Sequence, residues 1–194
     1  MATVRVEPSE TFLAERRKLG LDLFDEMWEG ELHMVPAPSF NHQDIGTQLI
    51  AALVPIVATV GLKALYETGL YDPDVAGHES FRVPDVTVFE PRLVAARGIE
   101  GPASLVVEIR SPNDETFDKF PYYERLGVGE VLVIDPTRHE VRHWSNGPDG
   151  LVEDETGDDP VELGCVPMRL GYQATTLVVE KVEATGALTP LFTV

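Results

Sequence analysis

Two acidic residues and one lysine stand where this sequence could support chemistry. Asp85 directly precedes the apolar segment 86–90, and Glu108 lies near the end of the apolar segment 105–109. Lys119 begins a stretch in which apolar residues recur at helical spacing. Burying a carboxylate within an apolar strand is costly unless a metal ion, a cation or water lies beside it. Glu108 is therefore the strongest functional clue in the sequence.

These three residue types together indicate metal-assisted hydrolysis of a phosphate ester. Asp85 and Glu108 would lie at the ends of neighbouring strands, where two carboxylates can hold one hard divalent cation such as Mg²⁺. Such an ion lowers the pKa of a bound water molecule, which then becomes a usable nucleophile near neutral pH. A nearby ammonium group, here that of Lys119, can orient the water and offset charge that grows on the phosphate.

The order of the motifs resembles the PD-(D/E)XK nuclease superfamily and, more closely, the Uma-two family of proposed restriction endonucleases. Three segments carry the resemblance: WEGELHMVPAPSFNHQ, RVPDVTVFE and LVVEIRSPNDETFDKFPYYERLGVGEVLVIDP. The resemblance implies an α/β (α+β mixed) fold with a restriction-endonuclease-like core, in which helices flank a central mixed β-sheet. It also implies Mg²⁺ (or Mn²⁺) as the cofactor, held by Asp85, Glu108 and the carbonyl of Ile109. DNA is the implied substrate, and we expect a homodimer by analogy.

Two residues nearer the N-terminus also match the family pattern. Glu31 resembles an acid that approaches the metal from outside the central sheet. His42 resembles a polar residue that faces the same cleft, where it would hydrogen-bond Glu31 or a substrate phosphate. Local sequence fits a structural role equally well, with Glu31 as a turn acid and His42 as a polar residue at a helix N-terminus.

The sequence departs from the superfamily pattern at the lysine. Arg110 occupies the third position of E-x-K, and residues two apart on a strand share a face, so its side chain could point toward Glu108 and contact phosphate. A guanidinium stays protonated and cannot act as a base. In Uma-two relatives the lysine is thought to come from the following helix, and Lys119 matches that place by its spacing to Tyr123 and Gly127. We favour Lys119 over Arg110.

Each member of the trio also has a purely structural interpretation. Asp85 follows Pro84 and could be a turn residue at the entry to a strand. Glu108 could form an ion pair with Arg110 or Lys119, and Lys119 could be a solvated residue in the first turn of its helix.

The elements that must position these residues follow from the apolar periodicity. We expect a single domain over residues 1–194, with a loose tail at 1–8 and an acidic loop at 145–160. A hairpin broken by Gly30 is predicted over 26–35. Helices are predicted over 9–19, capped by Ser9, from Ser39 or Asn41 to about Thr59, and after Ser111-Pro112. Strands are predicted at 63–67, 86–90, 105–109, 130–134, 140–144 and 175–180.

Composition limits the classes of function. The 33 acidic and 15 basic residues give a net charge of -18, which repels phosphate polymers at long range. A nuclease would need bound divalent cations or local clusters of Lys or Arg to admit DNA. The single cysteine, Cys165, excludes an intrachain disulfide and fits a reducing cytoplasm. We see no signal-peptide pattern, and the longest apolar run, 49–62, is interrupted and too short to span a bilayer.

Two hypotheses follow. The first is a metal-dependent endonuclease. The second is a catalytically weak or inactive nuclease fold that acts as an acidic protein-binding or regulatory module, which the net charge and Arg110 favour. They differ in geometry, because the first requires Asp85, Glu108 and Lys119 to converge on one metal-sized space. On a strand, His139 and His143 would lie about 13 Å apart, which is too far for both to bind one metal ion. We therefore expect them to be surface residues.

Overall fold

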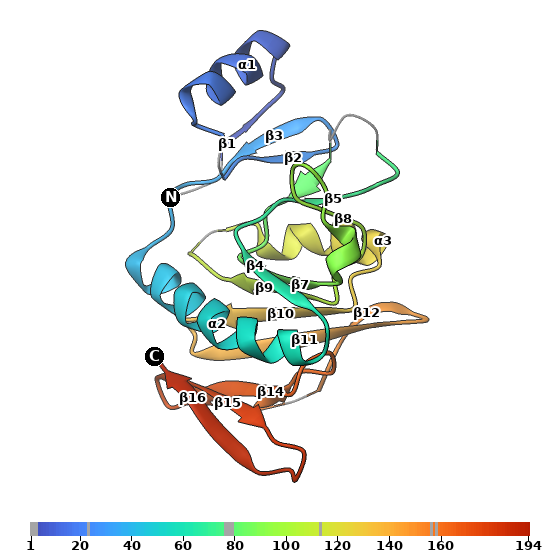
Figure 1. Ribbon diagram of the computed structural model, residues 1–194. Coiled ribbons are helices and arrows are strands. Elements are labelled where there is room, and N and C mark those ends of the chain that lie inside the picture. The colour runs from blue at the N-terminus through green and yellow to red at the C-terminus, as the bar shows by residue number, and fades with distance from the viewer. Residues whose placement is uncertain (1–3, 23, 76–79, 113, 156, 158) are drawn as a thin grey trace.

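A mixed six-stranded sheet forms the centre of the protein (Figure 1). The structure is a computed structural model that describes residues 4–22, 24–75, 80–112, 114–155, 157 and 159–194. The strand order is β12-β11-β10-β9-β7-β4. Strands β9 and β10 are parallel, with Val106 opposite Val131, and the other neighbours are antiparallel. The strand bounds are β4 Lys63–Tyr66, β7 Val86–Phe89, β9 Leu105–Ile109, β10 Glu130–Asp135, β11 Glu140–Gly147 and β12 Gly150–Glu153.

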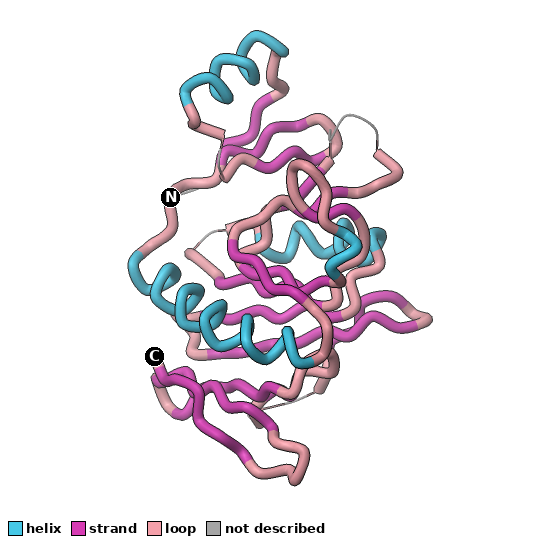
Figure 2. Tube along the Cα trace, in the orientation of Figure 1, coloured by secondary structure: helices cyan, strands magenta, loops and turns pink. Residues whose placement is uncertain are grey.

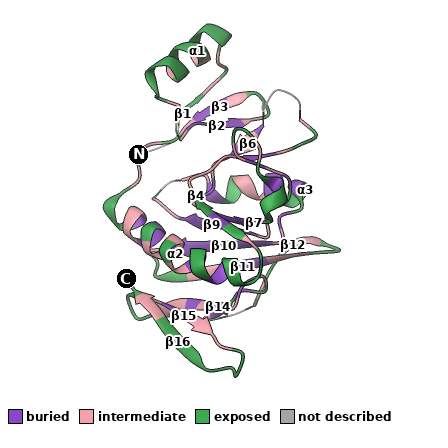
Figure 3. Ribbon diagram, in the orientation of Figure 1, coloured by how far each residue is buried: buried purple, intermediate pink, exposed green. Residues whose placement is uncertain are grey.

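The two parallel strands lie at the middle of the sheet and are buried along their whole length. Their runs of Val, Leu and Ile are the pattern expected for strands that are covered on both faces. Figure 3 shows this buried centre against the exposed helix α1, Glu10–Leu19, which has no buried residue. The predicted α/β fold with a central mixed sheet is confirmed.

Helices cover both faces of the central sheet. On one face, the long helix α2, Phe40–Thr59, packs Ile45, Leu49 and Leu53 into a core shared with β7, β9 and β10. It begins where predicted, because the Ser39 hydroxyl accepts a hydrogen bond from the His42 amide at 3.3 Å. On the other face lies α3, Phe120–Leu126, preceded by the short 3-10 helix η3, Thr116–Lys119.

A second sheet lies beside the N-terminal helix, and its strand order is β1-β3-β2-β6-β5-β8. The predicted hairpin is present as β2 and β3, joined by a turn in which Glu29 and Gly30 have φ of 48° and 92°. Another 3-10 helix, η2 Pro91–Leu93, precedes β8. The strand bounds are β1 Val4–Val6, β2 Glu26–Trp28, β3 Glu31–Met34, β5 Leu70–Tyr71, β6 Phe81–Arg82 and β8 Ile99–Glu100.

A third sheet, of order β13-β14-β15-β16, packs its apolar side chains against the same core as α2. The sequence predicted only one of these strands, at 175–180. Figure 2 shows how strands dominate this end of the molecule. The bounds are β13 Val161–Glu162, β14 Met168–Gln173, β15 Thr176–Val182 and β16 Leu188–Thr193.

The structure corrects three local predictions. Residues 4–6 are not a loose tail, because they pair with β3 and the Arg5 guanidinium contacts the Glu115 carboxylate. The segment 145–160 is not all loop, because β11 continues to Gly147 and β12 pairs back onto it. His143 is not a surface residue, because it is buried between two acidic side chains.

Within the part of the chain that the structure describes, no helix is both long and apolar enough to cross a membrane.

Candidate active-site cleft and metal centre

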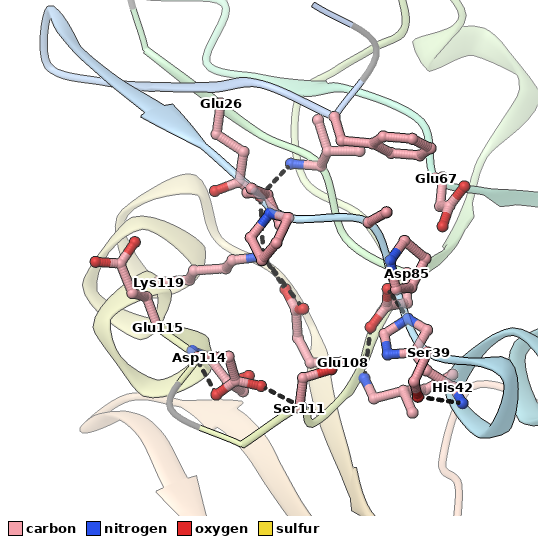
Figure 4. A pocket seen from close by; sticks show the side chains of 18 of the residues that line it. Glu26, Ser39, His42, Glu67, Asp85, Glu108, Ser111, Asp114, Glu115 and Lys119 are labelled. Carbon is pink, nitrogen blue, oxygen red and sulfur yellow. Dashed lines mark hydrogen bonds and ion pairs between the residues drawn. The ribbon is translucent and has the colours of Figure 1, made fainter. Parts of the chain in front are cut away.

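A cleft of about 280 Å³ opens between the start of α2, the ends of the central strands and the β2–β3 hairpin (Figure 4). Its charge is strongly negative, since Lys119 is the one lysine or arginine among the described residues that line it. The acidic lining residues are Glu26, Glu67, Asp85, Glu108, Asp114 and Glu115. Such a cleft attracts cations and repels a bare phosphate.

Asp85 is held rigidly at the cleft by three elements. Its Oδ2 accepts a hydrogen bond from the Ile109 amide at the end of β9, at 2.5 Å. Its Oδ1 lies 2.8 Å from Nε2 of His42 in the first turn of α2. Its backbone carbonyl accepts from the amide of Glu67, the residue that follows β4. The carboxylate therefore has a fixed direction before any ligand arrives.

Glu108 is the buried carboxylate that the sequence singled out, and only 3% of the residue is exposed. Both of its oxygens lie 3.2 Å from the Lys119 ammonium, and the Tyr123 hydroxyl donates a hydrogen bond to Oε1. Burial raises the pKa of Glu108, and the neighbouring charge of Lys119 opposes this shift while Asp85 adds to it. Burial prevails and raises the pKa of Glu108 to about 8, so the side chain needs further positive charge beside it to be ionised at neutral pH.

Lys119 lies at the junction of η3 and α3, where its ammonium reaches two carboxylates. Nζ lies 2.9 Å from Glu26 Oε1 as well as 3.2 Å from Glu108. Burial lowers the pKa of Lys119, but the charges of Glu108, Glu26 and Asp85 outweigh it and hold the pKa above its usual value. The side chain is therefore a fixed ammonium, which can orient a ligand or offset charge but cannot accept a proton.

Glu26, not Glu31, is the acid that the hairpin brings to the cleft. Its carboxylate accepts hydrogen bonds from the Val83 amide at 2.9 Å and from Trp28 Nε1 at 2.7 Å. Glu31 sits beside the turn with its side chain 45% exposed, and it is not among the residues that line the cleft. Glu26 was not among the residues expected in the cleft, although an acid at a buried strand position is the signal that identified Glu108.

The structure places His42 in the predicted cleft with a different partner. It contacts Asp85 and not Glu31. Burial lowers the pKa of His42, but the hydrogen bond and charge of Asp85, together with the charge of Glu67, outweigh it and raise the pKa.

Arg110 does not reach Glu108. Its Nη1 donates to Asp135 at 2.8 Å, and the guanidinium lies 5.1 Å from the centre of the Phe117 ring. It is not among the residues that line the cleft.

Ile109 lies in the cleft wall, and its amide already orients Asp85. Asp85, Glu108 and Lys119 therefore line one cleft together, as the enzyme hypothesis requires (Figure 4).

Glu67 is a further cleft residue that the sequence did not single out. Its carboxylate, a ring nitrogen of His42 and an oxygen of Asp85 all lie within 4.8 Å of one another. Glu67 closely follows β4 with no motif around it, so local sequence carries no signal of this grouping.

The mixed central sheet, its flanking helices and the acidic cleft at its strand ends define a restriction-endonuclease-like core. The model of the Uma2 family, described as "Putative restriction endonuclease", matches residues 21–175, and the chain belongs to this family.

A solved structure supports the fold assignment. It is described as "a putative nuclease belonging to DUF820" from Anabaena variabilis ATCC 29413 and has a TM-score of 0.55 and 19% sequence identity to this chain. The match covers 71% of this chain and 80% of that one. At this identity the likeness shows a shared fold. No curated protein matches the chain.

Proposed function

We propose that this protein is a metal-dependent endonuclease that hydrolyses DNA phosphodiester bonds with Mg²⁺ or Mn²⁺ as cofactor. The observation that carries the proposal is the meeting of Asp85, Glu108 and Lys119 in one cleft of a chain from a restriction-endonuclease family.

The donor set fits a hard divalent cation. Asp85 and Glu108 supply carboxylate oxygens, and the Ile109 carbonyl would complete the protein ligands as the family resemblance implies. Asp85 and Glu108 also repel each other, which helps to raise the pKa of Glu108, and a dication would relieve this repulsion. When bound, the ion would lower the pKa of a water molecule and offset negative charge on the phosphate.

The chain's own residues supply orientation and charge. The Ile109 amide fixes the direction of Asp85, while Glu26 and Glu108 hold the Lys119 ammonium in place. Because Lys119 stays protonated, its role is to orient the phosphate or the attacking water and to stabilise charge, not to remove a proton. Glu26 acts through Lys119 and is a positioning residue.

The negative field of the cleft supports a requirement for metal. With one lysine among six acidic side chains, the cleft opposes a phosphate until divalent cations enter. Cleavage should therefore depend steeply on the concentration of the metal. The same excess of negative charge is what favours the alternative of an acidic protein-binding module.

A cleavage assay tests the proposal. Supercoiled, linear and single-stranded DNA are incubated with the protein and MgCl₂ or MnCl₂, with EDTA as the negative control. We expect cleavage that disappears in Asp85→Asn and in Glu108→Gln and persists in Glu140→Gln, a matched change at an exposed residue. Folded wild-type protein that cleaves none of these DNAs with either metal would favour the protein-binding module.

The expected homodimer is tested separately, by light scattering of the protein as it elutes from a size-exclusion column.

A further inference from the structure

Three side chains from separate elements form a second potential ligand set at one end of the cleft. His42 comes from the first turn of α2, Glu67 follows β4 and Asp85 precedes β7. One ligand atom from each lies within 4.8 Å of the other two. Figure 4 shows Glu67, Asp85 and His42 on the opposite side of Glu108 from Lys119.

Glu67 is held in this position by its backbone and by a relay of side chains. Its φ of 45° is in the left-handed region, which is unfavourable for a residue with a side chain. The Gln43 amide donates to Glu67 Oε1 at 2.9 Å, and the Tyr66 hydroxyl donates to the Gln43 carbonyl at 3.1 Å. Support of this kind is typical of the residues that orient a metal ligand.

His42 is buried and incompletely paired. One ring nitrogen, Nε2, lies 2.8 Å from Asp85, while the buried Nδ1 has no hydrogen-bond partner among the described residues. A buried polar atom without a partner lowers the stability of the fold, so the position of this imidazole is not explained by stability alone.

The separations suit a small transition-metal ion after a minor adjustment. Ligand atoms around a tetrahedral Zn²⁺ lie roughly 3.4 Å apart, given metal–ligand distances of about 2.1 Å. His42 Nε2 and Asp85 Oδ1 lie 2.8 Å apart, and the ligand atoms of the three residues all lie within 4.8 Å of one another. Side-chain shifts of about 1 Å would therefore give tetrahedral spacing, with the fourth position open to the cleft.

We propose that His42, Glu67 and Asp85 form a second divalent-cation site that prefers a transition metal such as Zn²⁺ over Mg²⁺. The preference follows from the imidazole, because Mg²⁺ favours oxygen ligands whereas Zn²⁺ binds imidazole nitrogen well. Asp85 is the ligand shared with the Asp85–Glu108 position, and in that respect the inference rests on the proposed function.

Calorimetric titration with ZnCl₂ in saturating MgCl₂ tests this site apart from catalysis. Magnesium occupies the oxygen-only position, so we expect wild-type protein to bind one equivalent of Zn²⁺. Glu67→Gln and His42→Ala should each weaken this binding at least tenfold, while the exposed control Glu140→Gln should leave it unchanged. Urea unfolding of each variant shows whether it is folded. If His42→Ala does not fold, Glu67→Gln alone tests the site, because Glu67 is partly exposed.

Zinc binding that is absent, or that is unaffected by Glu67→Gln, overturns the inference. The DNA assay separates this result from the proposed function. Cleavage that depends on Glu108 without zinc binding at Glu67 would leave the nuclease proposal standing alone. Zinc binding that depends on Glu67, in a protein that cleaves no DNA, would support the site and count against the nuclease.

Discussion

The Lys119 ammonium lies 2.9 Å from the Glu26 carboxylate, and this ion pair joins the N-terminal hairpin to the helix beside the central sheet. Both side chains are almost fully buried. Lys119 also lies between Glu26 and the Glu108 carboxylate, so its position depends on two sheets that are distant in sequence. The geometry of the cleft therefore depends on how the hairpin docks, and not on the central motif alone.

The first prediction separates the two basic residues that compete for the role of the E-x-K lysine. We expect Lys119→Met to reduce cleavage by about 100-fold or more, because the variant lacks the charge that is proposed to stabilise the phosphate. Arg110→Met should leave cleavage nearly unchanged, since its guanidinium contacts Asp135 outside the cleft. Steady-state cleavage rates at saturating Mg²⁺ provide the measurement. A large loss in Arg110→Met with normal activity in Lys119→Met would reverse the assignment.

The second prediction concerns the two acids of the hairpin. Glu26→Gln removes the charge that holds Lys119 and should lower both the cleavage rate and the free energy of unfolding, the latter by about 1–3 kcal/mol. Glu31→Gln is the matched control, because that side chain is 45% exposed beside the turn and does not line the cleft. Urea denaturation and cleavage rates check both effects. Equal effects of the two variants on cleavage would show that Glu26 does not position Lys119.

Much of the central sheet could be predicted because its signals are local. Short stretches of sequence are enough to identify the apolar runs of β9 and β10 and the Ser39 cap of α2. The meeting of Asp85, Glu108 and Lys119 in one cleft could be predicted from their order along the chain, because that order resembles a known family.

The parts that escaped prediction depend on partners far away in the chain. The buried strand position of Glu26 is a local signal, but its contact with Lys119 depends on how the hairpin docks. Glu67 lies in the cleft with an unusual φ, which has no local signature. Strand β1 has only three residues, and it is a strand because it pairs with β3. His143 was expected at the surface, yet Glu130 and Asp154 enclose it.

The third prediction concerns removal of the metal. A cation that binds only the folded protein raises its stability by mass action, by about 2.7 kcal/mol at a concentration one hundred times the dissociation constant. We expect Mg²⁺ to raise the urea midpoint of wild-type protein and EDTA to reverse the change. The effect should vanish in Asp85→Asn and persist in Glu140→Gln. An unchanged midpoint in wild-type protein across a wide range of Mg²⁺ would contradict binding in the cleft.

The fourth prediction links stability to pH through His143 and Glu130. His143 Nε2 lies 2.9 Å from Glu130, whose carboxylate also accepts from the amides of Gly164 and Cys165 and so ties β10 to the segment before β14. Burial lowers the pKa of His143, but the hydrogen bonds with Glu130 and Asp154 outweigh it, so the pKa is raised. Burial raises the pKa of Glu130, but its hydrogen bonds outweigh burial, so the pKa is lowered.

The signs of these shifts set the pH range in which the pair stabilises the fold. The contribution of His143 is complete below about pH 6.5 and is lost as pH rises through its raised folded-state pKa. The contribution of Glu130 is present above about pH 4.5 and is lost as pH falls through its lowered folded-state pKa. Unfolding free energies of wild-type protein and His143→Asn, measured from pH 4 to 9, should therefore differ most between about pH 4.5 and 6.5, by about 1.5–3 kcal/mol. The exposed control His139→Asn should show no such window. A difference between wild type and His143→Asn that stays constant across the whole range would mean that His143 acts by packing and not by charge.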